Sequence, residues 1–267
     1  MTQKCKQNPA MSAFRKVSSF VLATGSCLVT SFALLKLALF LSTPGEVRLE
    51  KVWFYNFLDN ATLTNEILST VVMDLLLLSL FILPHSLLKA DAVKAFFHRR
   101  GLATWERSTY CLMSSCTLLV LMHNWASAPG LIVWRLDVAK QDRLWWVFVL
   151  LHGFAWAIVC GGSLIMDLPE ILGAKQIHHE ANHLAPPILY KTAELRRLYG
   201  HVRHPSFVCI TVILWAVNIL TLDRLLLNVL LTLYMYLAWN TDSQDYQYHK
   251  GQLYRKKYEL SLNLSEK

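Results

Sequence analysis

Long apolar segments separated by short polar ones dominate the pattern of the chain. Five such runs are present, at residues 17–41, 67–88, 108–128, 144–166 and 207–240. Each is long enough to match the roughly 20 residues with which an α-helix crosses the hydrocarbon core of a bilayer. Leu222-Asp223-Arg224 interrupts the last run, which splits into helices at 205–221 and 223–240. The pattern predicts an all-α, polytopic transmembrane bundle of six spans that ends in a helical hairpin.

Composition excludes an ordinary soluble domain. Of the 267 residues, 54% are hydrophobic and 16% are charged, whereas soluble domains have about 45–50% apolar and about 25% charged residues. No repeat or flexible linker divides the chain. We therefore expect an N-terminal tail (1–16), one membrane domain (17–240) and a C-terminal tail (241–267).

The net charge of +8 is explained by topology. Most of the 26 Lys and Arg residues fall in the two tails and in the loops 89–107 and 167–204. A six-span topology places all four segments on one side, which the positive-inside rule assigns to the cytoplasm or nucleoplasm. The basic residues therefore predict contact with the lipid bilayer, and no direct nucleic-acid partner is predicted.

The second span carries two polar side chains at depth, Asp74 near its middle and His85 near its inner end. A carboxylate in hydrocarbon costs about 2.5–3.5 kcal/mol, so Asp74 is expected to face other helices. It is either a functional-site residue or a protonated carboxyl bonded to a neighbouring backbone or hydroxyl group, and the second alternative is favoured. After this span, residues 92–97 form a short amphipathic pattern that predicts a helix at the membrane interface.

Two groups of residues raise the question of a metal site. His178, His179 and His183 stand beside Glu180, but the His-Glu-x-x-His spacing of a zinc site is absent. A solvated or interfacial histidine patch is favoured, and no metal is predicted. The six cysteines lie in or beside apolar spans or, for Cys5, in the N-terminal tail, which implies no disulfide framework.

The segment that enters the fifth span has the strongest potential for chemistry. Arg203 and His204 precede Pro205, and proline suits the first turn of a helix. The helix would then present free amides beside an arginine that binds anions and a histidine that exchanges protons. This segment is either an anion-binding site or a basic segment that only fixes the orientation of the span, and the residues favour neither alternative. Asp223 is predicted to cap the sixth span, which returns the acidic, tyrosine-rich tail at 242–248 to the same side.

Two resemblances extend this interpretation. The Gly-x-Val-Arg-His-Pro segment and the terminal hairpin resemble the C-terminal region of the isoprenylcysteine carboxyl methyltransferases. Arg203, His204 and Pro205 match that family, and Gln244 and Asp245 stand where it has a pair of glutamates. The resemblance implies that S-adenosylmethionine is a possible cofactor. Arg203 would then bind its carboxylate, His204 would orient or exchange a proton as candidate catalytic residue, and Asp245 would engage its hydroxyls or amine.

Over the whole chain, the sequence is more similar to the nurim family of multi-spanning nuclear-rim proteins. The similar stretches occur in the same order, at His85–Leu88, Val93–Phe96, Glu106–Tyr110, Leu172–Gln176, Leu198–Pro205 and Asp223–Leu227. This resemblance implies six spans, retention in the inner nuclear membrane, and no established catalysis. Nuclear envelope or lamina proteins are the partners it implies, and the endoplasmic reticulum membrane is the alternative location.

Two functional hypotheses follow. The first is a structural or organising protein of the inner nuclear membrane on a methyltransferase-like fold. The second is a methyltransferase that uses S-adenosylmethionine to modify a lipid or a prenylated cysteine at the cytosolic face. A channel or transporter is poorly supported, because no pair of broken helices is present.

Overall fold

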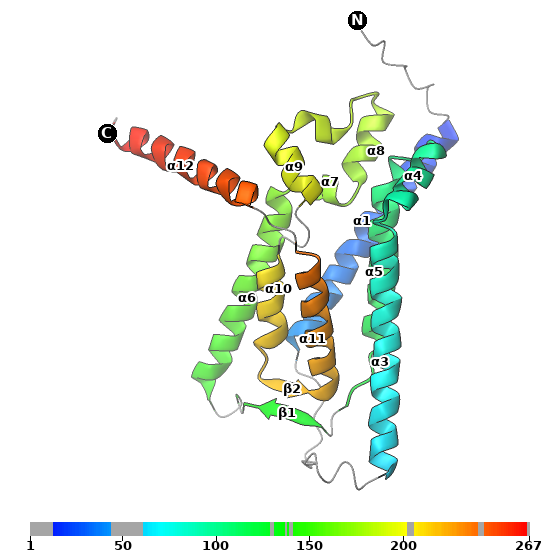
Figure 1. The fold of residues 1–267 in the computed structure, drawn as a ribbon, viewed down its shortest axis with the longest axis vertical. Coiled ribbons are helices and arrows are strands. Elements are labelled where there is room, and N and C mark those ends of the chain that lie inside the picture. The colour runs from blue at the N-terminus through cyan, green and yellow to red at the C-terminus, as the bar shows by residue number, and fades with distance from the viewer. Residues whose placement is uncertain are drawn as a thin grey trace, which may run out of the picture.

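The computed structural model describes residues 13–43, 61–128, 131–136, 138, 141–201, 206–239 and 243–265. The helices of the bundle run between the two ends of the molecule, and some of them are strongly tilted from its long axis (Figure 1). They are α1 (Ala13–Ser42), α3 (Ala61–Leu87), α5 (Trp105–Asn124), α6 (Asp142–Ile165), α10 (Phe207–Trp215) and α11 (Leu222–Leu237). The predicted all-α membrane architecture is confirmed.

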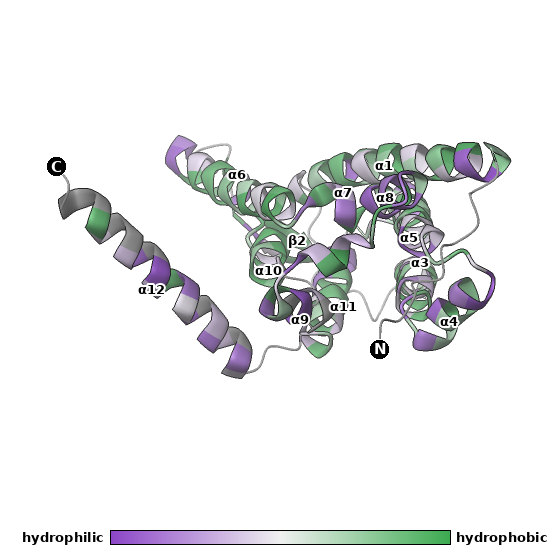
Figure 2. Ribbon diagram, turned by 90° about the horizontal axis from the view of Figure 1, so that it is seen from above, coloured by the Kyte–Doolittle hydropathy of each residue, from purple (hydrophilic) through white to green (hydrophobic). Residues whose placement is uncertain are grey.

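Within the described residues, three helices are long and apolar enough to cross a membrane: Ala13–Ser42, Thr64–Leu87 and Asp142–Ile165. The other three are more polar or shorter; α10, for example, has nine residues. The count of six spans therefore stays a prediction. Figure 2 shows hydrophobic residues along α1 and α6, whereas hydrophilic residues gather in the short helices at one end.

Helices α1 and α5 pack through small residues. The buried positions of α1 include Ser19, Ala23 and Ser26, and those of α5 include Ser108 and Cys111. Within lipid, small side chains allow helix backbones to approach closely, and this replaces the hydrophobic driving force that acts in water. Polar pairs add to the contact, since the Trp105 indole donates a hydrogen bond to Ser19 Oγ at 2.7 Å. The α1–α5 pair therefore forms one side of the bundle.

A larger apolar cluster joins α3 and α5 to the terminal hairpin. Its most deeply buried members include Leu78, Leu121, Ile213, Leu214 and Leu227, each at most 2% exposed. The four helices that supply them thus share one core, and the hairpin formed by α10 and α11 is built into the bundle.

At one end of the bundle, two strands form a short antiparallel ribbon that the sequence pattern did not predict. Strand β1 (Ile132–Arg135) pairs with β2 (Ile219–Thr221), and Ile132 lies opposite Thr221. The prediction that the fifth span continues as a helix to residue 221 was therefore wrong. The helix ends at Trp215, and the residues after it bond to β1 and the residue next to it; Leu136 N–H, for example, donates to Asn218 O at 2.8 Å.

Short helices cover the opposite end, which the charge pattern predicts to be cytosolic or nucleoplasmic (Figure 1). They are α4 (Asp91–Arg99), α7 (Leu168–Ile171), α8 (Ala174–Ala181), the 3-10 helix η2 (Pro187–Tyr190) and α9 (Ala193–His201). The helical prediction for residues 92–97 is confirmed by α4. The C-terminal tail is a helix, α12 (Ser243–Ser265), that projects away from the bundle.

Candidate functional site

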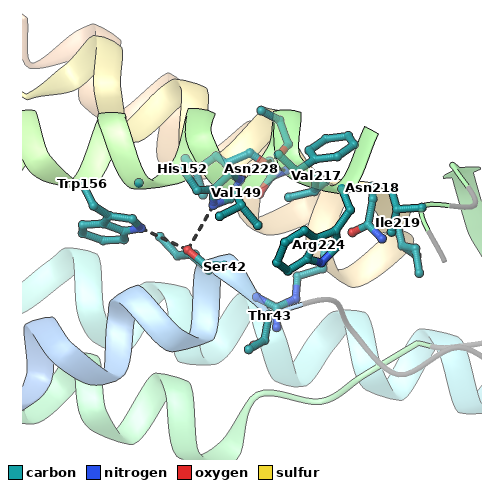
Figure 3. Close-up of a pocket in the computed structure, with 17 residues that line it drawn as sticks. Ser42, Thr43, Val149, His152, Trp156, Val217, Asn218, Ile219, Arg224 and Asn228 are labelled. Atoms are coloured by element: carbon teal, nitrogen blue, oxygen red, sulfur yellow. Dashed lines mark hydrogen bonds between the residues drawn. The ribbon is translucent and has the colours of Figure 1, made fainter. Parts of the chain in front are cut away.

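A cavity of about 380 Å³ lies between the end of α1, the helix α6 and the α10–β2–α11 segment. Its walls are largely apolar, with Leu41, Phe148 and Val149 among the lining residues. A few polar side chains converge on it, and Figure 3 shows them grouped around Ser42, the last residue of α1. An apolar enclosure with a small number of placed polar groups is typical of small-molecule sites.

His152 and Ser42 form a fully specified hydrogen-bond chain in this cavity (Figure 3). His152 Nε2 lies 2.7 Å from Ala216 O, and a carbonyl oxygen can accept only, so a neutral His152 carries its proton on Nε2. Its Nδ1 then accepts from the Ser42 hydroxyl at 3.0 Å. Ser42 Oγ in turn accepts from the Trp156 indole at 3.0 Å. These bonds tie α1 to α6 and α10.

Arg224, near the start of α11, supplies the positive charge of the cavity. Its Nη1 donates to Phe40 O at 2.9 Å, and its guanidinium carbon lies 4.0 Å from the centroid of the Phe40 ring. Its Nε lies 3.9 Å from Asp223 Oδ2. The side chain is 16% exposed and lines the cavity.

Behind the cavity, two buried carboxylates hold the extended segment that follows α5. Asp74 Oδ1 accepts the Ala126 N–H at 2.9 Å. Asp223 accepts the Ala128 N–H and the Trp125 indole N–H, both at 3.1 Å. For Asp74, the bond to a neighbouring backbone group that the favoured alternative predicts is present, whereas its protonation stays a prediction. For Asp223, the prediction of a helix cap was wrong: Thr221 precedes the helix, and Asp223 reaches the 125–128 segment instead.

His85 belongs to a separate polar cluster nearer the other end of the bundle. Its Nδ1 lies 3.1 Å from Ser114 Oγ, and its Nε2 lies 3.0 Å from the Tyr110 hydroxyl. Phe81 stacks on its ring. Asp74 bonds to Ala126 in the segment after α5, whereas His85 lies against Tyr110 and Ser114 of α5. The two side chains therefore do not form a buried pair.

At the predicted cytosolic end, ion pairs connect residues within the segment 167–191 that follows α6. The Lys175 ammonium, which donates a hydrogen bond to Asp167, holds the pKa of Asp167 below its ordinary value. Burial works against charge on Lys191, but the Glu170 carboxylate at 3.0 Å outweighs it and raises the pKa of Lys191. Burial also raises the pKa of the Tyr199 hydroxyl.

Glu180, from the histidine patch, connects this end to the start of α1. It accepts a hydrogen bond from Arg15 at 3.0 Å and one from the Thr104 hydroxyl. His179 Nδ1 lies 2.7 Å from Ala185 O. No group of three potential metal ligands is found among the described residues.

The residues predicted for cofactor binding are not brought together by the described part of the chain. Arg203, His204 and Pro205 lie outside the described residues. Asp245 is in α12, and its side chain is likewise outside the description. Their assignment to S-adenosylmethionine therefore stays a prediction.

Sequence reasoning missed the cavity residues His152, Ser42 and Arg224. A signal was available for one of them, because His152 is a polar side chain in the middle of the apolar run 144–166. Trp145 also lines this cavity, and its side chain is 46% exposed.

The helices and their apolar surfaces define an all-α integral membrane protein. Comparison with known proteins gives the family. A nurim homolog of Drosophila pseudoobscura pseudoobscura is 47% identical over 250 residues, which cover 94% of this chain and 99% of that protein. Nurim of Danio rerio is 40% identical, covering 70% and 68%, and nurim of Homo sapiens is 37% identical, covering 73% and 75%. The chain belongs to the nurim family. No protein-family model and no solved structure match it.

Proposed function

We propose that this protein is a structural or organising component of the inner nuclear membrane, where it is retained and where nuclear envelope or lamina proteins are its partners. The observation that carries the proposal is the use of its buried carboxylates. Asp74, Glu170 and Asp223 are each at most 7% exposed. Each binds a donor of the same chain through at least one oxygen: a backbone amide, an indole or a lysine. The other oxygen of Asp74, Oδ2, is buried and has no hydrogen-bond partner among the described residues.

This arrangement supports a scaffold because buried carboxyl groups that serve a conduit or a reaction need to face a substrate path. Here they hold the extended segment after α5 and the short helices after α6, both of which lie outside the long helices of the bundle. The location within the nuclear envelope rests on membership of the nurim family and on the basic loops of the predicted nucleoplasmic face.

The proposal is tested by photobleaching the full-length chain, tagged at its C-terminus, in the nuclear envelope of living cells. A retained component recovers much more slowly at the nuclear rim than a freely diffusing six-span protein of the endoplasmic reticulum, which serves as the control. Recovery at the rate of that control would contradict retention.

The alternative proposal is an S-adenosylmethionine-dependent methyltransferase on a related membrane fold, supported by the Arg203-His204-Pro205 segment before α10. Its test is binding of S-adenosylmethionine to the purified chain in nanodiscs, compared with an Arg203→Ala, His204→Ala variant that remains folded. Saturable binding that the variant loses supports the enzyme. No binding at millimolar concentration supports the scaffold.

A further inference from the structure

We propose that the cavity between α1, α6 and the α10–β2–α11 segment binds the anionic head group of a membrane phospholipid. Its volume of about 380 Å³ lies within the roughly 300–1,000 Å³ of small-molecule sites. It is separate from the Arg203-His204 segment, which is predicted to lie at the opposite, cytosolic end. The proposal is independent of the function proposed above.

The head-group contact is Arg224. A guanidinium has five N–H donors in a planar fork that fits a phosphate. Among the described residues, the Phe40 carbonyl oxygen is the hydrogen-bond acceptor of Arg224, and it takes one donor of Nη1. No acceptor of Nη2 is found in that part of the chain. Because Arg224 lines the cavity and 16% of its side chain is exposed, Nη2 is the donor proposed to meet a ligand there.

Two carboxylates, Asp223 and Asp74, already act on the charge of Arg224, so an anion competes with them for the guanidinium. Both oxygens of Asp223, the nearest carboxylate, already accept hydrogen bonds, from Ala128 and Trp125. Asp223 thus faces Nε of Arg224 and does not occupy Nη2. Figure 3 shows Thr43 beside the guanidinium, but its hydroxyl donates to Leu39 O at 2.6 Å, so Arg224 is the donor on which the proposal rests.

The apolar part of the cavity identifies the source of the anion as a lipid. Trp145 and Val149 of α6 line the cavity, yet they are 46% and 38% exposed. Among the residues of α6, Ala155 is the one that is buried, so most of this helix faces the hydrocarbon region. The cavity wall is therefore continuous with a surface that acyl chains cover. A phospholipid can place its phosphate on Arg224 and its chains along α6.

The test uses the full-length chain purified in detergent and native mass spectrometry with three probes: phosphatidic acid, phosphatidylcholine with the same acyl chains, and inorganic phosphate as a competitor. Gly153 lines the cavity, and a Cβ there meets no atom within 4 Å. Gly153→Leu therefore adds a bulky side chain at the cavity wall without removing a bond of Arg224. Gly161→Leu is the matched control, since Gly161 is on the same helix, is equally open, and is not part of the lining.

We expect wild type and Gly161→Leu to bind phosphatidic acid in preference to phosphatidylcholine. Gly153→Leu and Arg224→Gln should bind phosphatidic acid about tenfold more weakly, as expected when a charge-assisted contact is lost. Equal binding by the two glycine variants would overturn the cavity as the site. Equal binding of both lipids by wild type would overturn the role of charge. Displacement of phosphatidic acid by an equal concentration of inorganic phosphate would assign the site to free phosphate.

Discussion

Replacing Asp223 with alanine removes the acceptor for two buried donors at once. The Trp125 indole and the Ala128 amide both lie 3.1 Å from its carboxylate, and Asp223 is 2% exposed. A buried donor that loses its partner costs about 1–3 kcal/mol, so the two together cost about 2–6 kcal/mol. Arg224 also loses the carboxylate that lies 3.9 Å from its Nε. The free energy of unfolding should fall by an amount in this range.

The assay is thermal unfolding of the purified chain in detergent, followed by intrinsic tryptophan fluorescence. Asp223→Asn keeps one oxygen for one donor and should lose about half as much stability as Asp223→Ala. Asp142→Ala is the control, because Asp142 is exposed at the first position of α6 and should change stability by less than about 0.5 kcal/mol. The reasoning is refuted if Asp223→Ala unfolds at the same temperature as Asp142→Ala.

Two further substitutions test the predicted cytosolic end. At Gly173 (φ +87°), an added Cβ would lie 2.6 Å from the backbone nitrogen of Ser108. At Gly101 φ is +67°, but an added Cβ would meet no atom within 4 Å. Gly173→Ala should therefore lower the melting temperature more than Gly101→Ala. Equal losses would exclude the steric contact. In the folded protein the pKa of Asp167 lies below its unfolded value of 3.8, so the ionised carboxylate stabilises the fold above that pH, and this stabilisation disappears as Asp167 is protonated. Lys175→Met removes the partner of Asp167 and should therefore reduce the loss of stability in acid. Melting temperatures at about pH 6 and about pH 3 give the comparison, and an unchanged difference would count against the ion pair.

The helices of this protein follow from local sequence, and this is why they could be predicted. A run of apolar residues that approaches the thickness of a bilayer has few structural options, since every backbone polar group in lipid needs an internal partner. The ends of α1 and α6 accordingly fall within a few residues of the predicted limits. The end of α10 could not be predicted in this way, because Ile219–Thr221 pairs with a strand far away in the chain.

The candidate site shows the same division between local and distant information. Asp223 stands where a helix cap is favoured by local rules, but two donors from the 125–128 segment determine its position. The cavity joins Ser42, His152 and Ala216, which are separated by 110 and 64 positions along the chain. A single sequence gives no indication of such pairings, although a histidine within an apolar span does indicate that a partner is required.

Residence in the inner nuclear membrane is the central claim, and immunogold electron microscopy of the full-length chain with a C-terminal epitope tests it most directly. Gold is expected along the inner nuclear membrane, on its nucleoplasmic side, because the positive-inside rule predicts that the C-terminus lies there. Gold distributed over the endoplasmic reticulum, or on the lumenal side of the nuclear envelope, would contradict it.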